Sequence, residues 1–234
     1  MKEKRKVFLL ALPCVLTLLI AFIIPMVYTF IKAIMTDNLT YYTKFFTDPF
    51  YLKIFKNTLM LALKTTIVTL LLGYPSAYFI ARTKSRVKSF LLIATIFPFL
   101  VSAVIRAYGW MVILGSSGLL NQVLLKFGII ETPLSIMYTE TSVMIGMAQL
   151  LLPYMILAIT SVIQSIDKNV ENAAKSLGAN PIQTFVKVTL PLSAPGVISG
   201  CILVFTMGMT SYITPQLLGG AQYLTMTTLI FNQI

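Results

Sequence analysis

The sequence predicts an all-α polytopic membrane protein. Its 234 residues are 57% hydrophobic and 11% charged, with a mean hydropathy of +0.87, whereas a soluble domain carries about 25% charged residues. The apolar residues gather in runs long enough to cross a bilayer, which takes about 20 residues of helix. Histidine is absent and Asp plus Glu number seven, which leaves little material for acid–base or metal chemistry. We therefore expect no catalytic residues and no metal site.

Five runs are expected to be spans of one transmembrane domain, residues 1–234. They are Val7–Ile34, Thr58–Ala81, Ser89–Leu114, Ser142–Ile163 and Ala194–Leu218. The last three contain Pro98, Pro153 and Pro215, which neighbouring helices can accommodate. The first run is too long for a cleaved signal peptide, so we expect it to be retained. The uncharged segment Gln222–Ile234 is interpreted as part of a missing sixth span.

Two shorter stretches are expected at the outer membrane surface. Pro49–Asn57 is interpreted as a short interfacial helix that leads into the second span. Gly118–Gly128 is amphipathic and bounded by glycines, which is typical of a helix lying along the membrane.

The distribution of Lys and Arg predicts a cytoplasmic N-terminus, because basic residues concentrate in cytoplasmic segments. With that orientation the inner basic residues are Lys2, Lys4, Arg5, Lys6, Arg82, Lys84, Arg86, Lys88, Lys168, Lys175 and Lys187. The outer ones are Lys32, Lys44, Lys53, Lys56 and Lys126. The net charge of +11 is thus spread in short clusters between apolar runs, unlike the basic patch of a nucleic-acid-binding protein.

The inner connection Asp167–Pro191 is expected to form two short helices at a sharp angle. Asp167 can cap the first helix, and Gly178 can end it. Its apolar stripe would be Val170, Ala173, Ala174 and Leu177, and its polar face Glu171, Asn172, Lys175 and Ser176. Asn180 and Gln183 can form a capping box for the second helix, which Pro191 is expected to end.

This connection resembles the coupling loop of bacterial ATP-binding-cassette import permeases, whose pattern is E-A-A, three residues, G, nine residues, I-x-L-P. Five positions match, with Val188 at the isoleucine position: Ala173, Ala174, Gly178, Leu190 and Pro191. The family glutamate falls on Asn172, whereas Glu171 lies one residue earlier, about 100° around a helix. The resemblance implies that the loop docks on an ATPase through Glu171, Asn172, Ala173, Ala174, Lys175, Gly178, Leu190 and Pro191.

Four more segments are similar to polyamine-type permeases of this family: LLGYPSAYFIAR, PFLVSAVIRAYGWMVILG, TPLSIMYTETSVMIG and ITPQLLGG. The likeness implies a type I importer permease fold in the bacterial inner membrane. It also implies a second permease subunit, two ATPase subunits that hold ATP and magnesium, and an extracytoplasmic binding protein. The expected solute is a polyamine such as spermidine or putrescine, with another small organic solute or a metal ion as the alternative.

Candidate residues for the solute path are few. Arg106 is the one arginine inside a predicted span, where it either lines the path or anchors the helix at the interface. Lys64 is expected to extend its amine toward the interface. Four aromatic residues can either offer cation–π contacts or pack between helices: Tyr108, Trp110, Tyr154 and Tyr212. No Asp or Glu falls inside a span, so either the partner subunit supplies carboxylates for a polyamine, or these aromatic residues bind it, or the solute is not a polyamine.

Two other classes of membrane protein fit less well. A self-sufficient secondary transporter or channel usually has intramembrane acids or internal repeats, and the sequence has neither. A membrane-embedded enzyme would need a nucleophile–base pair or metal ligands in the spans. The chain also lacks a G-x-x-x-x-G-K-[ST] loop, so the energy for transport would come from a partner.

Overall fold

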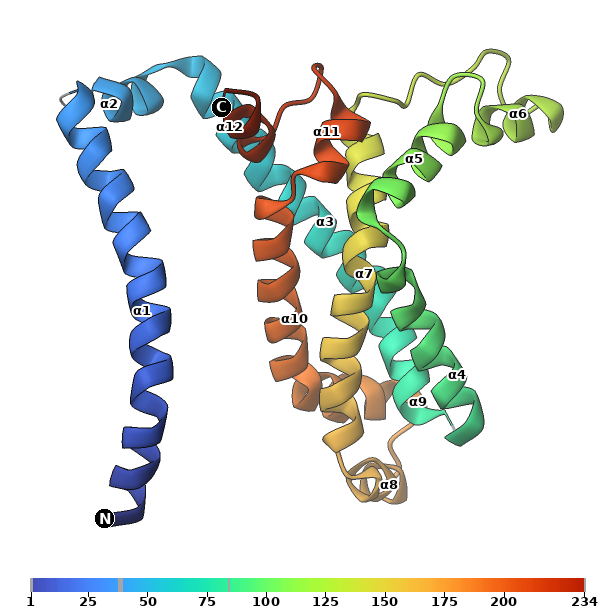
Figure 1. Ribbon diagram of the computed structural model, residues 1–234. Helices are drawn as coiled ribbons and strands as arrows, with labels where there is room; N and C mark the ends of the chain where they lie inside the picture. Colours follow the sequence, from blue (N-terminus) through green and yellow to red (C-terminus); the bar gives the residue numbers. More distant parts are fainter. Residues whose placement is uncertain (1, 38–39, 84, 234) are drawn as a thin grey trace. The chain divides into compact units, whose positions relative to one another are not determined.

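The computed structural model describes residues 2–37, 40–83 and 85–233, which form helices joined by turns and contain no strand (Figure 1). Lys84 of the predicted inner cluster lies outside these ranges. The chain forms two compact units, Met1–Lys53 and Ile54–Ile234. The smaller unit contains α1 (Lys2–Asp37), α2 (Thr40–Thr47) and the start of α3 (Pro49–Arg82). The larger unit contains the rest of α3 and all later elements.

The described residues contain five segments with the length and apolar composition of a membrane span: Val15–Lys32, Pro49–Arg82, Ala103–Lys126, Glu140–Ser165 and Pro181–Thr210. This confirms the predicted number of spans. The first segment, within α1, has its described side chains exposed. Such a helix requires lipid or another protein chain to cover its apolar surface.

The expected separate helix at Pro49–Asn57 is wrong, because α3 runs without interruption from Pro49 to Arg82. Pro49 stands at the first helical position, and the Asp48 carboxylate accepts the N–H of Phe50 at 2.9 Å. No glycine, proline or capping break occurs near Asn57. An established helix adds residues at little cost, so it continues into the span.

The predicted span Ser89–Leu114 is divided into α4 (Ser85–Ile96), a 3-10 turn (Phe97–Leu100) and α5 (Ala103–Leu114). The cause is Pro98, which lacks an N–H and clashes with the carbonyl one turn earlier. Val101 and Ser102 are extended, and Ser102 caps α5 by accepting the N–H of Val104 at 3.3 Å. The third apolar segment therefore begins at Ala103, after this break.

The predicted helix at Gly118–Gly128 is confirmed as α6 (Leu119–Lys126). Its buried residue is Asn121, whose amide donates to the carbonyls of Gly115 and Leu134 at 3.0 Å each. Asn121 also accepts the N–H of Leu134 at 2.8 Å. One side chain thus fastens the connection that follows α6 to the end of α5.

The next span is α7 (Glu140–Ser165), which forms the centre of the larger unit between α3 and α10 (Leu190–Thr210) (Figure 1). At its first residue, Glu140 Oε1 lies 2.6 Å from the Lys64 amine on α3. Farther along, Gly196 and Gly200 of α10 approach α7 closely. A Cβ at Gly196 would lie 2.8 Å from Val162 Cβ, and one at Gly200 would lie 2.8 Å from Met155 Sδ. Small residues at this spacing allow membrane helices to pack closely.

The predicted span Ala194–Leu218 also differs from the observed helices, because α10 begins earlier, at Leu190, and ends at Thr210. A short helix, α11 (Ile213–Gly219), follows, and then α12 (Met226–Gln233). Pro215 is the third residue of α11, where a backbone N–H has no partner within the helix. A continuous helix would instead place the Pro215 ring against the carbonyl of Ser211, so the chain breaks there.

Candidate coupling site

The first coupling helix is α8 (Lys168–Ser176), whose two ends are fixed by local hydrogen bonds. At the start, the Asp167 carboxylate accepts the N–H of Asn169 at 2.9 Å. At the end, Gly178 has a φ of +89°, and its N–H donates to the Lys175 carbonyl at 2.9 Å. The N–H of Ala179 donates to the Ala174 carbonyl at 3.0 Å. This pair of bonds is a Schellman motif, and it confirms the predicted cap and stop.

The second coupling helix is α9 (Pro181–Thr184), and its predicted capping box is confirmed. The N–H of Gln183 donates to Asn180 Oδ1 at 2.7 Å, and the N–H of Asn180 donates to Gln183 Oε1 at 3.0 Å. The expectation that Pro191 ends this helix is wrong. The chain passes from α9 through a π-helical segment (η2, Phe185–Thr189) directly into α10.

The π-helical turn explains why Pro191 does not break the chain. Leu190 donates its N–H to the carbonyl of Phe185, five residues earlier. The wider turn occurs just before Pro191, where a tight α-helical turn would meet the proline ring. The second coupling helix and the span α10 are consequently one continuous helical rod.

Glu171 is buried, with 7% of its surface exposed, although it was expected on the polar face of α8. Its carboxylate oxygen Oε1 accepts hydrogen bonds from Arg82, at the end of α3, and from the Thr189 hydroxyl at 3.0 Å. A buried carboxylate requires such partners, because an unpaired buried charge is strongly destabilising. Glu171 therefore joins three elements: α8, α3 and η2.

Aromatic contacts extend this connection along α3. The ring of Phe185 in η2 lies edge-on to Tyr74 and Tyr78, with centroid distances of 5.7 and 5.3 Å. The hydroxyl of Tyr74 also lies 2.7 Å from Ser193 Oγ on α10, and both groups are buried. The coupling segment is thus held against α3 by an ion pair and aromatic packing, and a side-chain hydrogen bond joins α3 to α10 just beyond the segment.

The apolar residues of the coupling helices face outward. Leu177 is 89% exposed and Ile182 is 75% exposed, and Val170 and Val186 are also exposed. The expected apolar stripe of α8 thus does not pack inside the chain. The side of α8 that faces the rest of the chain is the one that carries Glu171, which bonds to Arg82 and Thr189. Exposed apolar side chains clustered on a capped, rigid segment are typical of a protein-binding surface.

Apart from the buried Glu171, the structure separates the predicted coupling residues into three groups. Asn172, Ala173 and Lys175 are exposed on α8. Ala174 and Gly178 line a hollow of about 320 Å³ beside Gln183 and Lys187. Leu190 and Pro191 lie apart from them, in an apolar hollow of about 330 Å³ on α10.

The predicted path residues lie on α5, on α7 and in the connection between α10 and α11. Arg106 of α5 and Tyr154 of α7 are close enough to interact electrostatically, and the Tyr154 ring packs on Phe99. Tyr108 is exposed and Trp110 packs against the core. Tyr212 lies between α10 and α11 and stacks on Phe231, with a centroid distance of 4.4 Å.

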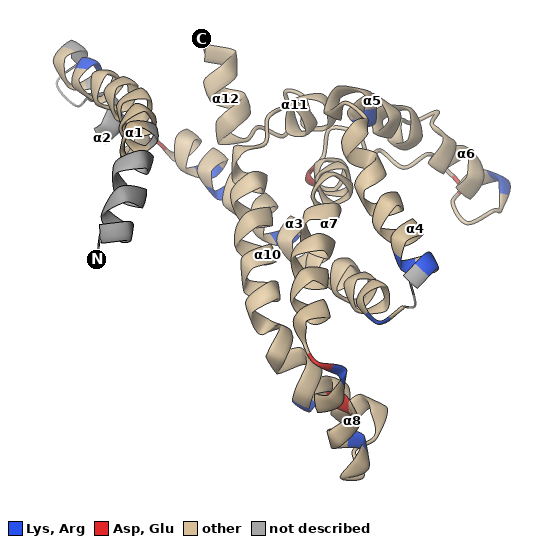
Figure 2. Ribbon diagram, turned by 60° about the horizontal axis from the view of Figure 1, so that its bottom comes forward, with Lys and Arg blue, Asp and Glu red and all other residues tan. Residues whose placement is uncertain are grey.

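Arg82 and Thr189 were missed by reasoning from the sequence. Arg82 was counted only as one of the basic residues of the inner turn, and Thr189 carried no motif. Their role depends on contact between residues 82, 171 and 189, which are far apart in sequence. No pattern of nearby residues predicts such a contact. The basic residues near the turn after α3, Arg82 and Lys88, lie at the same end of the larger unit as Lys168 of α8 (Figure 2).

Residues 69–234 match the protein family described as "Binding-protein-dependent transport system inner membrane component". The chain belongs to this family. It is therefore the membrane-embedded permease component of a binding-protein-dependent importer. Family membership confirms the resemblance seen in the coupling segment.

Curated relatives of this importer permease include spermidine/putrescine transport system permease proteins. PotB of Escherichia coli K12 is 40% identical over 197 residues, which cover 84% of this chain and 70% of PotB. PotB of Haemophilus influenzae is 40% identical over 82% of this chain and 67% of its own length. A more distant relative, the molybdenum transport permease ModB of Mycobacterium bovis, is 29% identical.

Solved structures confirm the fold. A bacterial importer of the acidic polysaccharide alginate has a chain that superposes with a TM-score of 0.71 at 19% identity. The match covers 97% of this permease and 80% of that chain. The same kind of transporter, in complex with a pentasaccharide-bound periplasmic protein, gives a TM-score of 0.69 over 87% of this permease and 72% of its chain.

Proposed function

We propose that this chain is one permease subunit of an ATP-driven polyamine importer and that α8 and α9 dock on a partner ATPase. The observation that carries the proposal is the coupling segment. It has capped ends, exposes apolar side chains, and is bound through Glu171 to the end of a span. In this arrangement the chain itself is not an enzyme, and ATP with magnesium binds the partner.

The contacts of the segment define how closure of the ATPase would reach the membrane. A push on α8 passes through Glu171 to Arg82 and therefore to α3. A push on α9 passes along the continuous backbone to α10, while Phe185 carries it to Tyr74 and Tyr78. The two spans α3 and α10 therefore move together. Glu171 acts within the chain, and Asn172 on the exposed side of α8 is free to meet the ATPase.

The proposed assembly contains a second permease subunit, two ATPase subunits and an extracytoplasmic binding protein, in the bacterial inner membrane with the N-terminus of this chain in the cytoplasm. The polyamine assignment is supported by the 40% identity to permeases named for spermidine and putrescine. A polycation needs carboxylates or aromatic faces. Within this chain the aromatic candidates are Tyr108, Trp110, Tyr154 and Tyr212, and the carboxylates would come from the partners.

The docking proposal is tested by placing a charge on the exposed apolar residues. Leu177→Asp and Ile182→Asp are expected to weaken capture of the ATPase subunit by roughly tenfold or more, because docking would bury an unpaired carboxylate in the interface. Capture is measured by co-purification from membranes that contain the whole transporter. Binding-protein-stimulated ATP hydrolysis should fall in parallel.

The matched control is Leu119→Asp, which alters an exposed leucine of α6 at the other end of the larger unit. It should leave ATPase capture unchanged. If Leu177→Asp and Ile182→Asp both retain full capture and full stimulation, α8 and α9 are not the coupling surface. Binding of labelled spermidine by the cognate binding protein tests the solute separately.

A further inference from the structure

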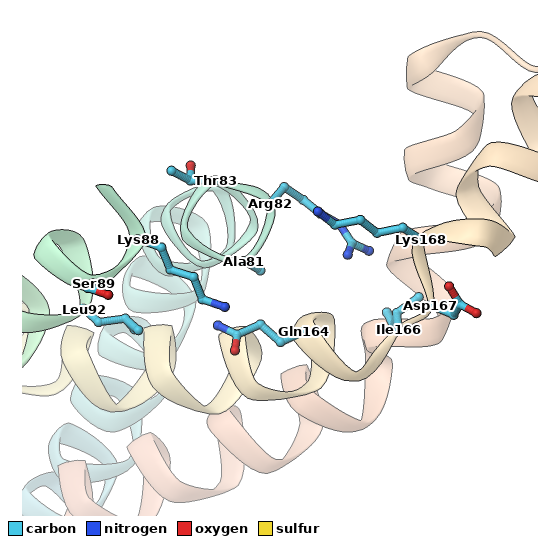
Figure 3. A pocket seen from close by; sticks show the side chains of 10 residues that line it. All are labelled: Ala81, Arg82, Thr83, Lys88, Ser89, Leu92, Gln164, Ile166, Asp167 and Lys168. Carbon is cyan, nitrogen blue, oxygen red and sulfur yellow. The ribbon is translucent and has the colours of Figure 1, made fainter. Parts of the chain in front are cut away.

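A cavity of the larger unit lies beside the coupling site and is separate from its apolar surface. It has a volume of about 1010 Å³ and lies between the end of α3, the start of α4 and the turn from α7 to α8 (Figure 3). Its basic lining residues are Arg82, Lys88 and Lys168, and the amide side chain of Gln164 also lines it. The function proposed above uses Arg82 but gives no role to the two lysines.

The cavity carries positive charge that the described chain does not neutralise. Glu171 neutralises Arg82. Lys88 and Lys168 form no ion pair or hydrogen bond with the described residues. Asp167 lines the cavity, but its carboxylate accepts the N–H of Asn169 and points away from Lys88 (Figure 3). Two unpaired amines that face one cavity repel each other, and a bound anion would relieve that repulsion.

The walls of the cavity favour an anion with an apolar tail. Ala81, Leu92 and Ile166 line it beside the basic groups. The helix that carries Lys88, α4, also exposes the apolar side chains of Phe90 and Ile93. The cavity lies where the spans α3 and α7 end, which is the depth of lipid headgroups. A free phosphate would use the amines but not this apolar surface.

We infer that this cavity binds the phosphate headgroup of an anionic phospholipid from the cytoplasmic leaflet, with Lys88 and Lys168 as its ligands and an acyl chain along α4. Basic pockets between membrane helices on the cytoplasmic side are suited to such headgroups. The inference rests on the proposed function only for the orientation of the chain. A lipid at this place would contact the turn after α3 and the start of α8. It would therefore lie beside the Arg82–Glu171 ion pair that holds α8 against α3.

The test uses the assembled transporter in lipid nanodiscs and spin-labelled phosphatidylglycerol as the probe, with spin-labelled phosphatidylcholine for comparison. The wild-type protein is expected to immobilise more phosphatidylglycerol than phosphatidylcholine. Each lysine near the headgroups contributes roughly fivefold in affinity, so Lys88→Gln and Lys168→Gln should each lower the preference by about that factor. The control is Arg86→Gln, which removes an exposed charge of α4 that does not line the cavity.

Four results would overturn the inference. The first is no preference for phosphatidylglycerol in the wild type, and the second is an equal loss in the Arg86→Gln control. The third is calorimetric binding of inorganic phosphate in phosphatidylcholine nanodiscs that depends on the same lysines, which would assign the site to a free anion. The fourth is loss of ATPase capture in the lysine variants with lipid retention unchanged, which would assign the lysines to the ATPase. Lipid retention needs neither ATP nor binding protein, so its outcome is independent of whether the chain imports a polyamine.

Discussion

Glu171 shows how one residue can decide the placement of a whole segment. In sequence it is a polar residue on a short amphipathic helix, one position away from the family glutamate. In the structure it is buried and bonded to Arg82 and Thr189. The apolar side of α8 is thereby left exposed, which is the reverse of what helical periodicity alone predicts.

We predict that Glu171→Ala destabilises the permease by about 3 kcal/mol, because it leaves the charge of Arg82 largely buried without its partner. Thermal unfolding of the purified transporter measures this loss. The exchange variant Arg82→Glu with Glu171→Arg should recover much of the stability, since the Thr189 hydroxyl can serve either charge. Lys175→Ala, on the exposed side of the same helix, should stay within about 0.5 kcal/mol of the wild type. An exchange variant as unstable as Glu171→Ala would show that the ion pair does not seat α8.

Gly178 permits a second residue-scale comparison. A Cβ added there meets no atom within 4 Å, and the same holds at Gly109 in α5. Of these two glycines, Gly178 has a positive φ, +89°, and Gly109 does not. We expect Gly178→Ala to destabilise by roughly 1–2 kcal/mol, because a side chain disfavours left-handed backbone. Gly109→Ala, inside a helix, should instead stabilise by about 0.5–1 kcal/mol. Equal effects of the two substitutions on the unfolding temperature would contradict this reading.

At the scale of the elements, the ends of the two coupling helices were predictable, because their capping residues are close in sequence. Asp167, Gly178, Asn180 and Gln183 behave as their sequence positions predict. Breaks inside apolar runs were not predictable, because Pro98 breaks a span whereas Pro153 lies within the continuous helix α7. Each proline leaves the carbonyl four residues earlier without its helical hydrogen bond. Whether the helix continues depends on the groups around that carbonyl, which the hydropathy of the sequence does not predict.

The packing of α10 on α7 gives an element-scale prediction. An added methyl at Gly196 would press on the branched Val162, whereas one at Gly200 meets the flexible end of Met155. Gly196→Ala is therefore expected to destabilise by about 1–3 kcal/mol, and Gly200→Ala by clearly less, since a methionine side chain can move aside.

Val162→Ala tests this packing, because it removes Val162 Cγ2, which the new methyl would meet at 2.9 Å, and leaves Val162 Cβ in place. Combined with Gly196→Ala, it should restore part of the lost stability. Thermal unfolding of the single and double variants gives the coupling between the two sites. Additive losses would mean that Val162 Cγ2 does not limit the size of residue 196.

At the scale of the whole molecule, composition and span length predicted the membrane class and the number of spans. The motif around Gly178 predicted the family. The sequence did not reveal which residues join distant segments, as the path residues show. Arg106, Tyr154 and Tyr212 were grouped by type, and the sequence did not indicate that Tyr212 stacks on Phe231 of α12. Distances across the bundle depend on packing that a single sequence does not specify.

The orientation of the molecule is open to direct measurement. Single-cysteine variants Ser176→Cys, at the last residue of α8, and Ser116→Cys, after α5, place thiols at exposed positions at opposite ends of the larger unit. With Cys14 and Cys201 replaced, a membrane-impermeant maleimide should label the Ser116→Cys variant in spheroplasts and the Ser176→Cys variant only in inverted vesicles. The reverse pattern would place the coupling segment outside the cell and would refute the proposed cytoplasmic docking.

The π-helical turn at Phe185–Thr189 has a consequence for how this chain can tolerate insertions and deletions. A turn of this kind contains one residue more than an α-helical turn, so it offsets the angular phase of α9 from that of α10 by about 100°. Deleting one residue of 185–189 would remove this offset, but an α-helical turn at that place would bring the Pro191 ring against the carbonyl one turn earlier, so the rod would kink there. The coupling helices would then point in a different direction relative to α10, and the permease would present the wrong side to its ATPase.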